Sequence, residues 1–293
     1  GTQMNIPTAH IEGGDITEGG ALDDSVRHAM TKLSHIHFTT NEQATNRLLA
    51  MGEASWRVNT VGFPAIDLIA DNNFASSEEL VDKYKIDLNK PLVLFTQHSV
   101  TTEFELADSQ ILPSLEALKD LSDENYQIII TYPNNDIGGI KIIEAINNFF
   151  KNTKNKNIQI HQSLGRYDYH GILSLASSKK NRIVCVGNSS SGIKETPAFY
   201  CPTVNIGSRQ KGRLRALNVI DANYNKEEIY KAIKKCSTDS DFISSCQRVE
   251  NPYGVGDAGK KIAKILAEID IDLKKLLRKE MTLKGVKTKE GFK

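Results

Sequence analysis

Short apolar runs alternate with longer amphipathic segments along most of the chain. Apolar runs bounded by turn residues are typical of buried strands, and apolar positions three to four residues apart are typical of helices. The runs predict strands at residues 6–11, 36–40, 58–61, 92–96, 126–131, 158–161, 183–186 and 203–206. The amphipathic segments predict helices at residues 24–33, 41–51, 103–121, 139–150, 167–176, 193–199, 226–235 and 258–269. Five strands with intervening helices within about 115 residues indicate an α/β fold with a doubly wound parallel sheet.

The loops that follow the predicted strands carry the polar residues best suited to bind a ligand. Right-handed crossovers place every strand-to-helix loop of a parallel sheet at one edge of that sheet. Residues 97–98, 133–136, 163–166 and 187–192 all follow strands. We therefore expect these four loops to converge at the edge where open α/β sheets bind their ligands.

The loop at residues 187–192, Gly-Asn-Ser-Ser-Ser-Gly, runs into a predicted helix. Unpaired amide groups, the hydroxyls of Ser189 and Ser190 and the positive end of the helix dipole would together suit a phosphate. Arg209 could add positive charge, and Glu195 could accept a hydrogen bond from a ribose hydroxyl. The alternative is an ordinary serine N-cap. A P-loop is excluded, because the chain lacks G-x-x-x-x-G-K-[ST].

A second glycine-rich stretch, residues 254–259, matches G-x-G-x-x-G. A dinucleotide fingerprint needs a strand directly before it and a βαβ unit around it. The sequence pattern predicts neither of these features here. We therefore interpret the stretch as a turn that leads into a helix, and we expect no nicotinamide cofactor.

Three histidines are candidates for chemistry. His98 directly follows a predicted strand and is a candidate ligand or proton donor, although a single histidine is more often structural. His35 and His37 share an alternating strand, but no carboxylate or cysteine lies nearby at the spacing of metal ligands. The sequence therefore predicts no metal site.

Acidic residues cluster near the start of the chain, at Glu12, Asp15, Glu18, Asp23 and Asp24. This many carboxylates disfavour a phosphate pocket and suit a site that stabilises positive charge or transfers protons. The alternative interpretation is a solvated acidic loop.

Composition narrows the class of protein. The 293 residues are 39% hydrophobic and 25% charged, as in soluble globular proteins of one large or two ordinary domains. The net charge of +1 gives no electrostatic support for binding nucleic acid. The sequence has no apolar run of about 18 residues and no signal-peptide pattern, so we expect no membrane segment. Four cysteines without a C-x-x-C pair favour free thiols in the cytoplasm.

Several motifs, in order along the whole chain, resemble the UDP-N-acetylglucosamine 2-epimerases, in particular the hydrolysing branch that feeds sialic-acid-type sugar synthesis. They are His10-Ile11-Glu12-Gly13-Gly14, Asp23-Asp24-Ser25-Val26-Arg27-His28, Gln97-His98, Tyr132-Pro133-Asn134-Asn135-Asp136, Gly187-Asn188-Ser189-Ser190-Ser191-Gly192 and Asn251-Pro252-Tyr253-Gly254. The resemblance implies a glycosyltransferase-B-like fold, in which two Rossmann-like domains hold a UDP-sugar substrate between them.

The resemblance also implies roles for individual residues. Those expected to contact UDP are Asn134, Ser189, Ser190, Glu195 and Arg209, with His98 near the diphosphate and backbone around Gly165 against the uracil. Those matching the family's proton-transfer site are Glu12, one of Asp23 and Asp24, and the neighbouring Arg27. No cofactor or metal is implied. A homodimer is expected, with residues 41–51 as a candidate contact.

The family's opening strands, with their phosphate loop, have no counterpart in this sequence. We therefore expect residues 1–70 to form an incomplete first Rossmann-like domain and residues 71–90 to form a linker and the start of the second. Residues 91–270 would form the UDP-binding domain, and residues 271–293 a helical tail. The expected reaction converts UDP-N-acetylglucosamine to UDP and N-acetylmannosamine. The alternatives are the same reaction on a 2,4-diacetamido sugar nucleotide of a legionaminic-type pathway, glycosyl transfer, and an inactive UDP-binding fragment.

Overall fold

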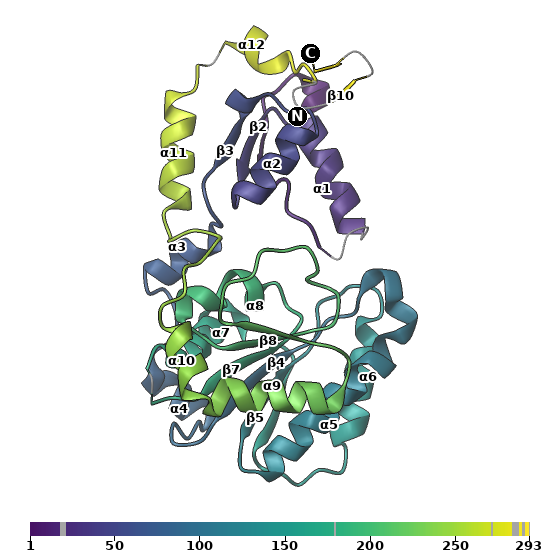
Figure 1. Cartoon of the computed structure of the whole chain (residues 1–293), viewed down its shortest axis with the longest axis vertical. Helices are drawn as coiled ribbons and strands as arrows, with labels where there is room; N and C mark the ends of the chain where they lie inside the picture. Colours follow the sequence, from purple (N-terminus) through teal and green to yellow (C-terminus); the bar gives the residue numbers. More distant parts are fainter. Residues whose placement is uncertain (18–21, 179, 271, 283–286, 289–290, 293) are drawn as a thin grey trace. The chain divides into compact units, whose positions relative to one another are not determined.

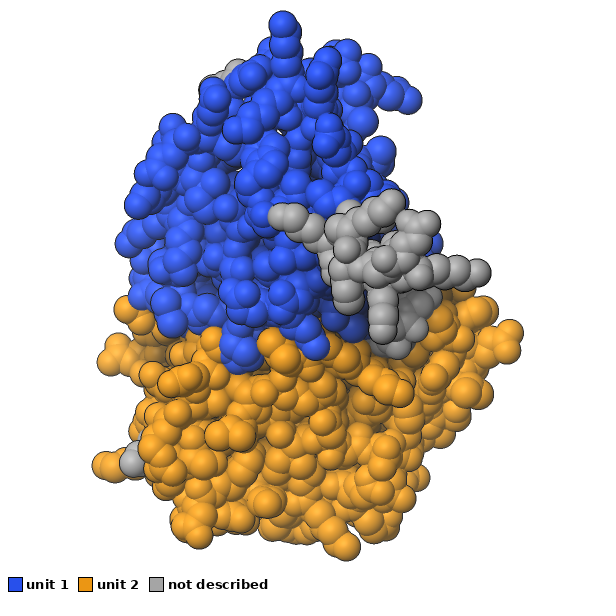
Figure 2. Space-filling view, turned by 45° about the horizontal axis from the view of Figure 1, so that its top comes forward, with its two compact units in different colours: residues 1–71, 252–293 blue, residues 72–251 orange. Residues whose placement is uncertain are grey.

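The computed structural model describes residues 1–17, 22–178, 180–270, 272–282, 287–288 and 291–292. The chain divides into two units, one of residues 1–71 with 252–293 and the other of residues 72–251 (Figure 2). Glu18, one of the predicted acidic residues, lies outside the described residues.

The second unit is built on a parallel six-stranded sheet with the order β6-β5-β4-β7-β8-β9 (Figure 1). Its strands are β4 (Leu92–Thr96), β5 (Gln127–Thr131), β6 (Ile158–His161), β7 (Ile183–Gly187), β8 (Thr203–Ile206) and β9 (Val219–Ala222). Every residue of β4, β5, β7 and β8 is buried. Parallel sheets are covered on both faces, which explains why continuous apolar runs predict these strands. The predicted doubly wound parallel sheet is confirmed.

Helices cover both faces of this sheet. They are α4 (Ser77–Tyr84), α5 (Ala107–Asp123), α6 (Gly139–Phe150), α7 (Gly165–Ser174), α8 (Ser191–Lys194), α9 (Lys226–Thr238) and α10 (Ser240–Cys246), with 3-10 helices η3 (Thr101–Leu106), η4 (Leu175–Ser177) and η5 (Thr196–Phe199). Val184 and Val186 of β7 join one core with α5, α6 and α9. Successive strand residues face opposite sides. Cys185 therefore faces α7, whose Tyr169 hydroxyl lies 3.7 Å from its sulfur.

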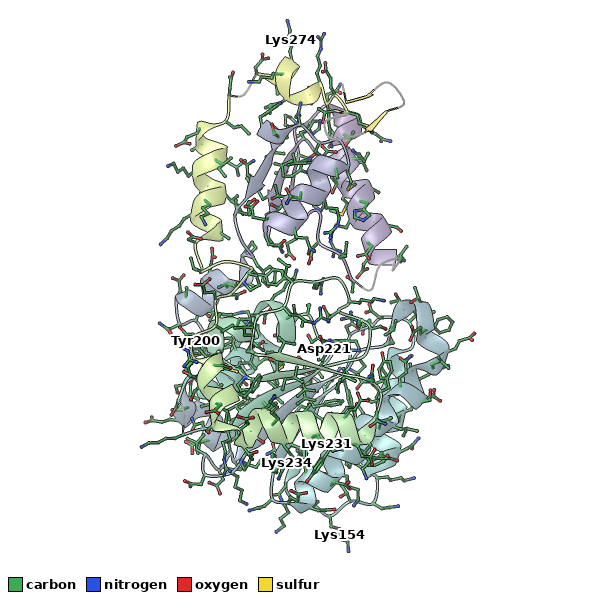
Figure 3. All side chains as sticks on the ribbon, in the orientation of Figure 1. Lys154, Tyr200, Asp221, Lys231, Lys234 and Lys274 are labelled. Atoms are coloured by element: carbon green, nitrogen blue, oxygen red, sulfur yellow. The ribbon has the colours of Figure 1, made fainter. Side chains whose placement is uncertain are left out.

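The outer face of α9 is polar, as its amphipathic sequence requires. Lys231 and Lys234 project from this helix (Figure 3), and Lys234 Nζ lies 2.9 Å from a carboxylate oxygen of Glu124. Ile229 and Ile233 are fully buried on its inner face. This division between the two faces fixes how α9 packs on the sheet.

The topology of the second unit creates a switch point. β4 lies inside the sheet, and the chain adds β5 and β6 on one side of it and β7, β8 and β9 on the other. The loops after β4 and β7 therefore leave the sheet in divergent directions. Ligands of open α/β sheets bind at such a point, outside the carboxyl ends of the strands.

The first unit contains a parallel three-stranded sheet, ordered β1 (Ala9–Ile11), β2 (Ile36–Thr39) and β3 (Val58–Thr60). Its helices are α1 (Leu22–Leu33), α2 (Glu42–Ala50), α3 (Ala65–Ala70), α11 (Ala258–Glu268) and α12 (Leu273–Leu277), with 3-10 helices η1 (Thr2–Met4) and η2 (Ser55–Arg57). Near the C-terminus, β10 (Lys287–Thr288) pairs antiparallel with β11 (Gly291–Phe292). Asn41 caps α2 by accepting a hydrogen bond from the amide of Ala44.

The C-terminal part of the chain departs from the predicted domain boundaries. Residues 252–270, expected in the second domain, lie in the first unit. Three residues of α11 or its end, Ile262, Ile265 and Ile269, pack on a core of Ile36, Phe38, Val61 and Leu276. The carboxylate of Asp67 accepts hydrogen bonds from the amides of Ala258 and Gly259, at 3.0 and 2.7 Å. The stretch at residues 254–259 is thus a turn into a helix, as predicted. The free amides at the start of α11 are paired by the carboxylate of Asp67, which is distant in the sequence.

Two cationic side chains, the buried Arg57 and the half-buried Lys279, tie the part of the chain after α11 to the rest of the first unit. Arg57 donates to four main-chain carbonyls, those of His35, Lys275, Leu276 and Arg278. Lys279 donates to three carbonyls at the end of α1 and beyond it, those of Thr31, Lys32 and Ser34. The last carbonyls of a helix receive no hydrogen bond from amides of the same helix. Lys279 therefore pairs with carbonyl oxygens that would otherwise need water.

Glu53 is a buried carboxylate at the centre of this arrangement. It lies 2.9 Å from Lys32 Nζ, 2.8 Å from Lys279 Nζ and 3.0 Å from His37 Nε2. Burial raises the pKa of Glu53, but the hydrogen bonds from His37, Lys279 and Lys32 outweigh burial and hold the pKa at about 2. Burial lowers the pKa of Lys279, although Glu53 acts in the opposite direction. The carboxylate is therefore charged at neutral pH and stabilises the fold.

We predict that Glu53→Gln lowers the free energy of unfolding of the first unit by about 3 kcal/mol, because it leaves the half-buried Lys279 and Lys32 without the buried carboxylate that pairs with them. The pKa of Glu53 in the folded state lies below its ordinary value of 4.5. Its contribution is therefore fully present above pH 4.5 and is lost as the pH falls towards 2. Trp56, the only tryptophan, lies 4.1 Å from the Arg57 guanidinium and reports urea unfolding of this unit by fluorescence.

The matched control is Glu268→Gln, which removes an exposed pair with Lys264 in the same unit. It should change the free energy of unfolding by about 0.5 kcal/mol or less. Equal stability of Glu53→Gln and the parent chain between pH 5 and 8 would contradict a stabilising role for the buried carboxylate.

Candidate functional site

A cavity of about 320 Å³ opens at the carboxyl ends of β4 and β5 in the second unit. It is lined by Thr96, His98, Thr131, Tyr132, Gln162, Ser163, Leu164, Gly165, Arg166, Tyr169, His170, Ser189, Ser191 and Glu195. Four predicted site residues thus share one cavity: His98, Gly165, Ser189 and Glu195. The position is the one that the topological switch point predicts, and the volume falls within the range of small-molecule sites.

Asn188 joins the loop after β7 to the loop after β4. Its side-chain oxygen accepts a hydrogen bond from the amide of His98 at 2.6 Å, and its side-chain nitrogen donates to the carbonyl of His98 at 2.8 Å. Its own amide donates to the carbonyl of Thr96 at 3.1 Å. Asn188 thus continues the pairing of the two strands beyond their ends and fixes the backbone of His98.

This close approach requires glycine at position 187. Gly187 has φ of +129°, and a Cβ atom there would lie 1.9 Å from the carbonyl oxygen of Thr96. No side chain fits in that space. Gly165, at the start of α7, also has a positive φ, of +69°, but no atom lies within 4 Å of its Cβ position. Position 187 therefore requires glycine because no Cβ atom fits beside Thr96, whereas position 165 favours glycine only because of its positive φ.

His98 is a neutral hydrogen-bonding group. Burial, followed by the nearby Arg209, lowers the pKa of His98 to about 4. Its Nδ1 lies 3.1 Å from the amide nitrogen of Asn134, which is a donor, and 3.0 Å from the side-chain oxygen of Asn134, which is an acceptor. Nδ1 can accept from the first or donate to the second, and the tautomer of the ring follows from which of these bonds forms. At neutral pH, His98 can form a hydrogen bond to a ligand through Nε2, but it supplies no positive charge.

Two predicted UDP-binding residues lie beside the cavity without lining it. Asn134 is exposed and contacts His98. Arg209 donates to the carbonyl of Asn188 at 3.2 Å and lies 3.2 Å from a carboxylate oxygen of Asp136. The guanidinium is therefore held near the β7 loop by a neighbouring acid.

The serine loop matches the prediction only in part. Ser189 lines the cavity, and its hydroxyl accepts a hydrogen bond from the amide of Ser191. Ser190 is the N-cap residue of α8 and does not line the cavity. The predicted helix at residues 193–199 is divided into α8 and η5. Because α8 has only four residues, its dipole is small, and the local amide and hydroxyl groups matter more than the dipole.

The predicted acidic residues lie in the first unit, where two of them differ sharply in environment. Asp24 is buried, and its Oδ1 accepts hydrogen bonds from the amide of Thr17 at 2.7 Å and from Arg27 at 3.3 Å. Asp23 is exposed in the first turn of α1. Arg27 also donates to the carbonyl of Asp15. Asp24 therefore holds the amide of Thr17 and the guanidinium of Arg27 at one carboxylate oxygen.

Glu12 lies in a constrained turn at the end of β1. Its φ is +65°, an uncommon value for a residue with a side chain, and its amide donates to the carbonyl of Phe38 at 2.9 Å. The neighbouring His10 is buried, and its Nδ1 lies 3.2 Å from the hydroxyl of Thr31. Burial, with smaller effects from His37 and Arg27, lowers the pKa of His10 to about 4. The charge near Glu12 thus comes from carboxylates and Arg27, and His10 is neutral.

Sequence reasoning missed several cavity residues, notably Thr131, Gln162, Tyr169 and His170. Thr131 ends β5, Gln162 follows β6, and the other two lie in the first turns of α7, positions that topology alone could have supplied. The orientation of Tyr169 and His170 depends on packing and has no local signature.

Within the described part of the chain, no group of three or more histidine, cysteine or acidic side chains is placed to hold a metal ion. No helix among the same residues is both long and apolar enough to cross a membrane.

These features define an α/β protein with a ligand cavity at the switch point of a parallel sheet. A family model described as UDP-N-acetylglucosamine 2-epimerase matches residues 1–267. The chain therefore belongs to the UDP-N-acetylglucosamine 2-epimerase family.

Among relatives, a protein from Campylobacter jejuni named GDP/UDP-N,N'-diacetylbacillosamine 2-epimerase (hydrolyzing) is 37% identical over 222 residues. That match covers 76% of this chain and 55% of the relative. A UDP-N-acetylglucosamine 2-epimerase from Neisseria meningitidis is 36% identical over 230 residues, which are 78% of this chain and 56% of that protein. The chain thus spans little more than half the length of these relatives.

A crystal structure of UDP-GlcNAc 2-epimerase from Neisseria meningitidis bound to UDP-GlcNAc has a TM-score of 0.77 at 18% identity. The match covers 92% of this chain and 71% of that one. The predicted α/β, glycosyltransferase-B-like fold class is confirmed. A Rossmann-like parallel sheet is present in each unit, and the first has three strands among the described residues.

We predict that Gly187→Ala destabilises the second unit by about 3 kcal/mol, since a Cβ atom overlaps the Thr96 carbonyl in addition to the strain of a positive φ. Gly165→Ala is the matched control, with strain of about 1 kcal/mol and no overlap. Urea unfolding followed by far-UV circular dichroism measures both. Equal losses for the two variants would contradict the close approach of the loop to β4.

Proposed function

We propose that this chain acts as a hydrolysing 2-epimerase that converts UDP-N-acetylglucosamine to UDP and N-acetylmannosamine. The observation that carries the proposal is the shared cavity of His98, Gly165, Ser189 and Glu195 at the switch point, in a member of this family. Cavities at this point of an open parallel sheet suit nucleotides. The acidic residues of the first unit supply the second requirement, groups that can accept a proton.

In this proposal the second unit binds UDP. The residues assigned to the nucleotide are Asn134, Gly165, Ser189, Ser190, Glu195 and Arg209, with His98 near the diphosphate. Neutral His98, in the tautomer that carries its proton on Nε2, and the serine hydroxyls would donate hydrogen bonds to phosphate oxygens. Arg209 would contribute positive charge when a diphosphate competes with Asp136 for its guanidinium. Oriented donors of this kind stabilise a charge that develops on a leaving group.

The chemistry of the sugar sets the order of events. The C2 hydrogen lies beside no carbonyl group, so a carboxylate cannot remove it directly at a useful rate. The bond from C1 to the diphosphate oxygen therefore breaks first, or nearly so, and leaves an oxocarbenium-like centre that makes the C2 hydrogen acidic. A carboxylate takes that proton and gives 2-acetamidoglucal. Water adds at C1, a proton adds to the opposite face of C2, and free N-acetylmannosamine results.

We assign the proton transfers to Glu12 and Asp23, with Asp24 as a positioning residue. Asp24 already binds the amide of Thr17 and the guanidinium of Arg27, which suits an orienting role. Asp23 is exposed and Glu12 is half-buried, so both carboxylates are accessible to a ligand. No metal or redox cofactor is required by this scheme.

A second candidate substrate is a UDP-2,4-diacetamido-trideoxy sugar. The Campylobacter jejuni relative, which is named for diacetylbacillosamine, is as similar to this chain as the Neisseria protein named for N-acetylglucosamine. Both sugars carry the 2-acetamido group and the anomeric diphosphate on which the scheme depends. The alternative of an inactive UDP-binding fragment uses only the cavity of the second unit. The expected homodimer also stays a prediction.

We expect the chain to release UDP from one of the two nucleotide sugars and to yield the 2-epimeric free sugar. In deuterated water the product should carry deuterium at C2, which mass spectrometry and proton NMR detect. Glu12→Gln should lower turnover by about 100- to 10,000-fold, as expected for loss of an acid–base group, without weakening UDP binding.

The outcomes separate the alternatives. Deuterated N-acetylmannosamine supports the proposal, and its 4-acetamido counterpart favours the second substrate. UDP binding without release of sugar supports the inactive fragment. Transfer of sugar to an acceptor, or release of N-acetylglucosamine without deuterium, would overturn the epimerase assignment.

A further inference from the structure

His170 is a buried histidine whose one hydrogen-bonding partner among the described residues is a cavity carboxylate. It lies in α7 and is 2% exposed. Its Nε2 lies 2.9 Å from Oε2 of Glu195. Its Nδ1 is buried without a hydrogen-bond partner, and its ring packs at a tilt against Phe199, with centroids 5.5 Å apart. Burying an imidazole costs free energy, and a single hydrogen bond repays only part of it.

The unpartnered Nδ1 defines which nitrogen carries the proton. A proton on Nδ1 would be a buried donor without an acceptor, which is costly. A ring with its proton on Nε2 avoids that cost and donates to Glu195. His170 is therefore a fixed donor aimed at one carboxylate oxygen.

The same oxygen of Glu195 receives a second hydrogen bond. The hydroxyl of Ser191 donates to Oε2 at 2.7 Å. Oε2 thus has two donors, from α7 and from α8, whereas Oε1 has no hydrogen-bond partner among the described residues. Glu195 lines the cavity, and its side chain is 16% exposed. The two donors hold the carboxylate in one orientation and leave Oε1 as an acceptor for a ligand.

The carboxylate of Glu195 would repel the phosphates of a bound diphosphate, so it must have another partner on the ligand. It attracts hydroxyl groups, and one oxygen with two lone pairs can accept hydrogen bonds from both hydroxyls of a vicinal diol. The ribose contact of Glu195 is already part of the proposed UDP site. We infer in addition that His170 is a positioning residue that orients Glu195 and leaves Oε1 as the acceptor for the ribose 2'- and 3'-hydroxyls. This inference rests on the proposed binding of UDP by the second unit.

The test compares UDP with 2',3'-dideoxy-UDP by isothermal titration calorimetry. The parent chain should bind UDP about 10- to 100-fold more tightly, as expected for hydrogen bonds to a charged acceptor. His170→Leu should weaken UDP binding by about 10-fold or more and change the affinity for the dideoxy analogue less than about twofold. His170→Gln, which keeps a side-chain N–H at a similar reach, should retain most of the preference for UDP.

A role for His170 in packing alone would give a different pattern, in which His170→Leu weakens both nucleotides equally. That pattern would overturn the inference. In a Glu195→Gln background, His170→Leu should have no further effect on the ratio of the two affinities. Circular dichroism and urea unfolding check that each variant is folded.

The parent chain alone also provides a decisive result. Equal affinity for UDP and its dideoxy analogue would refute selection of the diol and leave the proposed UDP site intact. Failure to bind either nucleotide would instead overturn the proposed function itself.

Discussion

The parallel pairing of β4 with β7 is the constraint on which the candidate site depends. The two strands pair residue for residue from Leu92 opposite Ile183 to Thr96 opposite Gly187. They therefore end together at the switch point. Glycine at 187 lets the following loop pass the Thr96 carbonyl. The side chain of Asn188 then forms hydrogen bonds with both the amide and the carbonyl of His98. His98 and the serine loop are neighbours because these strands end in register.

Much of the second unit could be predicted because its signals are local. The bounds of β4, β8 and α6 match the apolar pattern closely, since buried parallel strands are continuous apolar runs. β9 was missed because Asp221, which bonds to Asn205 and Arg215, interrupts its short apolar run. The return of residues 252–282 to the first unit was also missed. It depends on hydrogen bonds between residues about 200 positions apart, which no local pattern contains.

The site shows the same division between local and long-range information. Topology predicts which loops meet, so His98, Gly165, Ser189 and Glu195 could be found from the order of strands and helices. It does not predict how a side chain inside α7 is oriented, and His170 was therefore not found. Protonation is also a property of packing, because the neutrality of His98 follows from its burial beside Arg209.

On the proposed function, most of the donors that a leaving diphosphate would meet in the second unit are neutral. His98 is neutral, and Arg209 already contacts the carboxylate of Asp136. Arg166 lines the cavity and adds a positive charge, and its guanidinium donates to the carbonyl and the side-chain oxygen of Asn73. The other donors are hydroxyls, amides and the His98 ring, all attached to elements whose positions the sheet fixes. Fixed dipoles in a partly buried cavity stabilise developing charge without the reorganisation that water requires. Departure of UDP would then depend on the orientation of neutral donors as well as on the arginines, and the Gly187–Asn188 connection between β7 and β4 fixes that orientation.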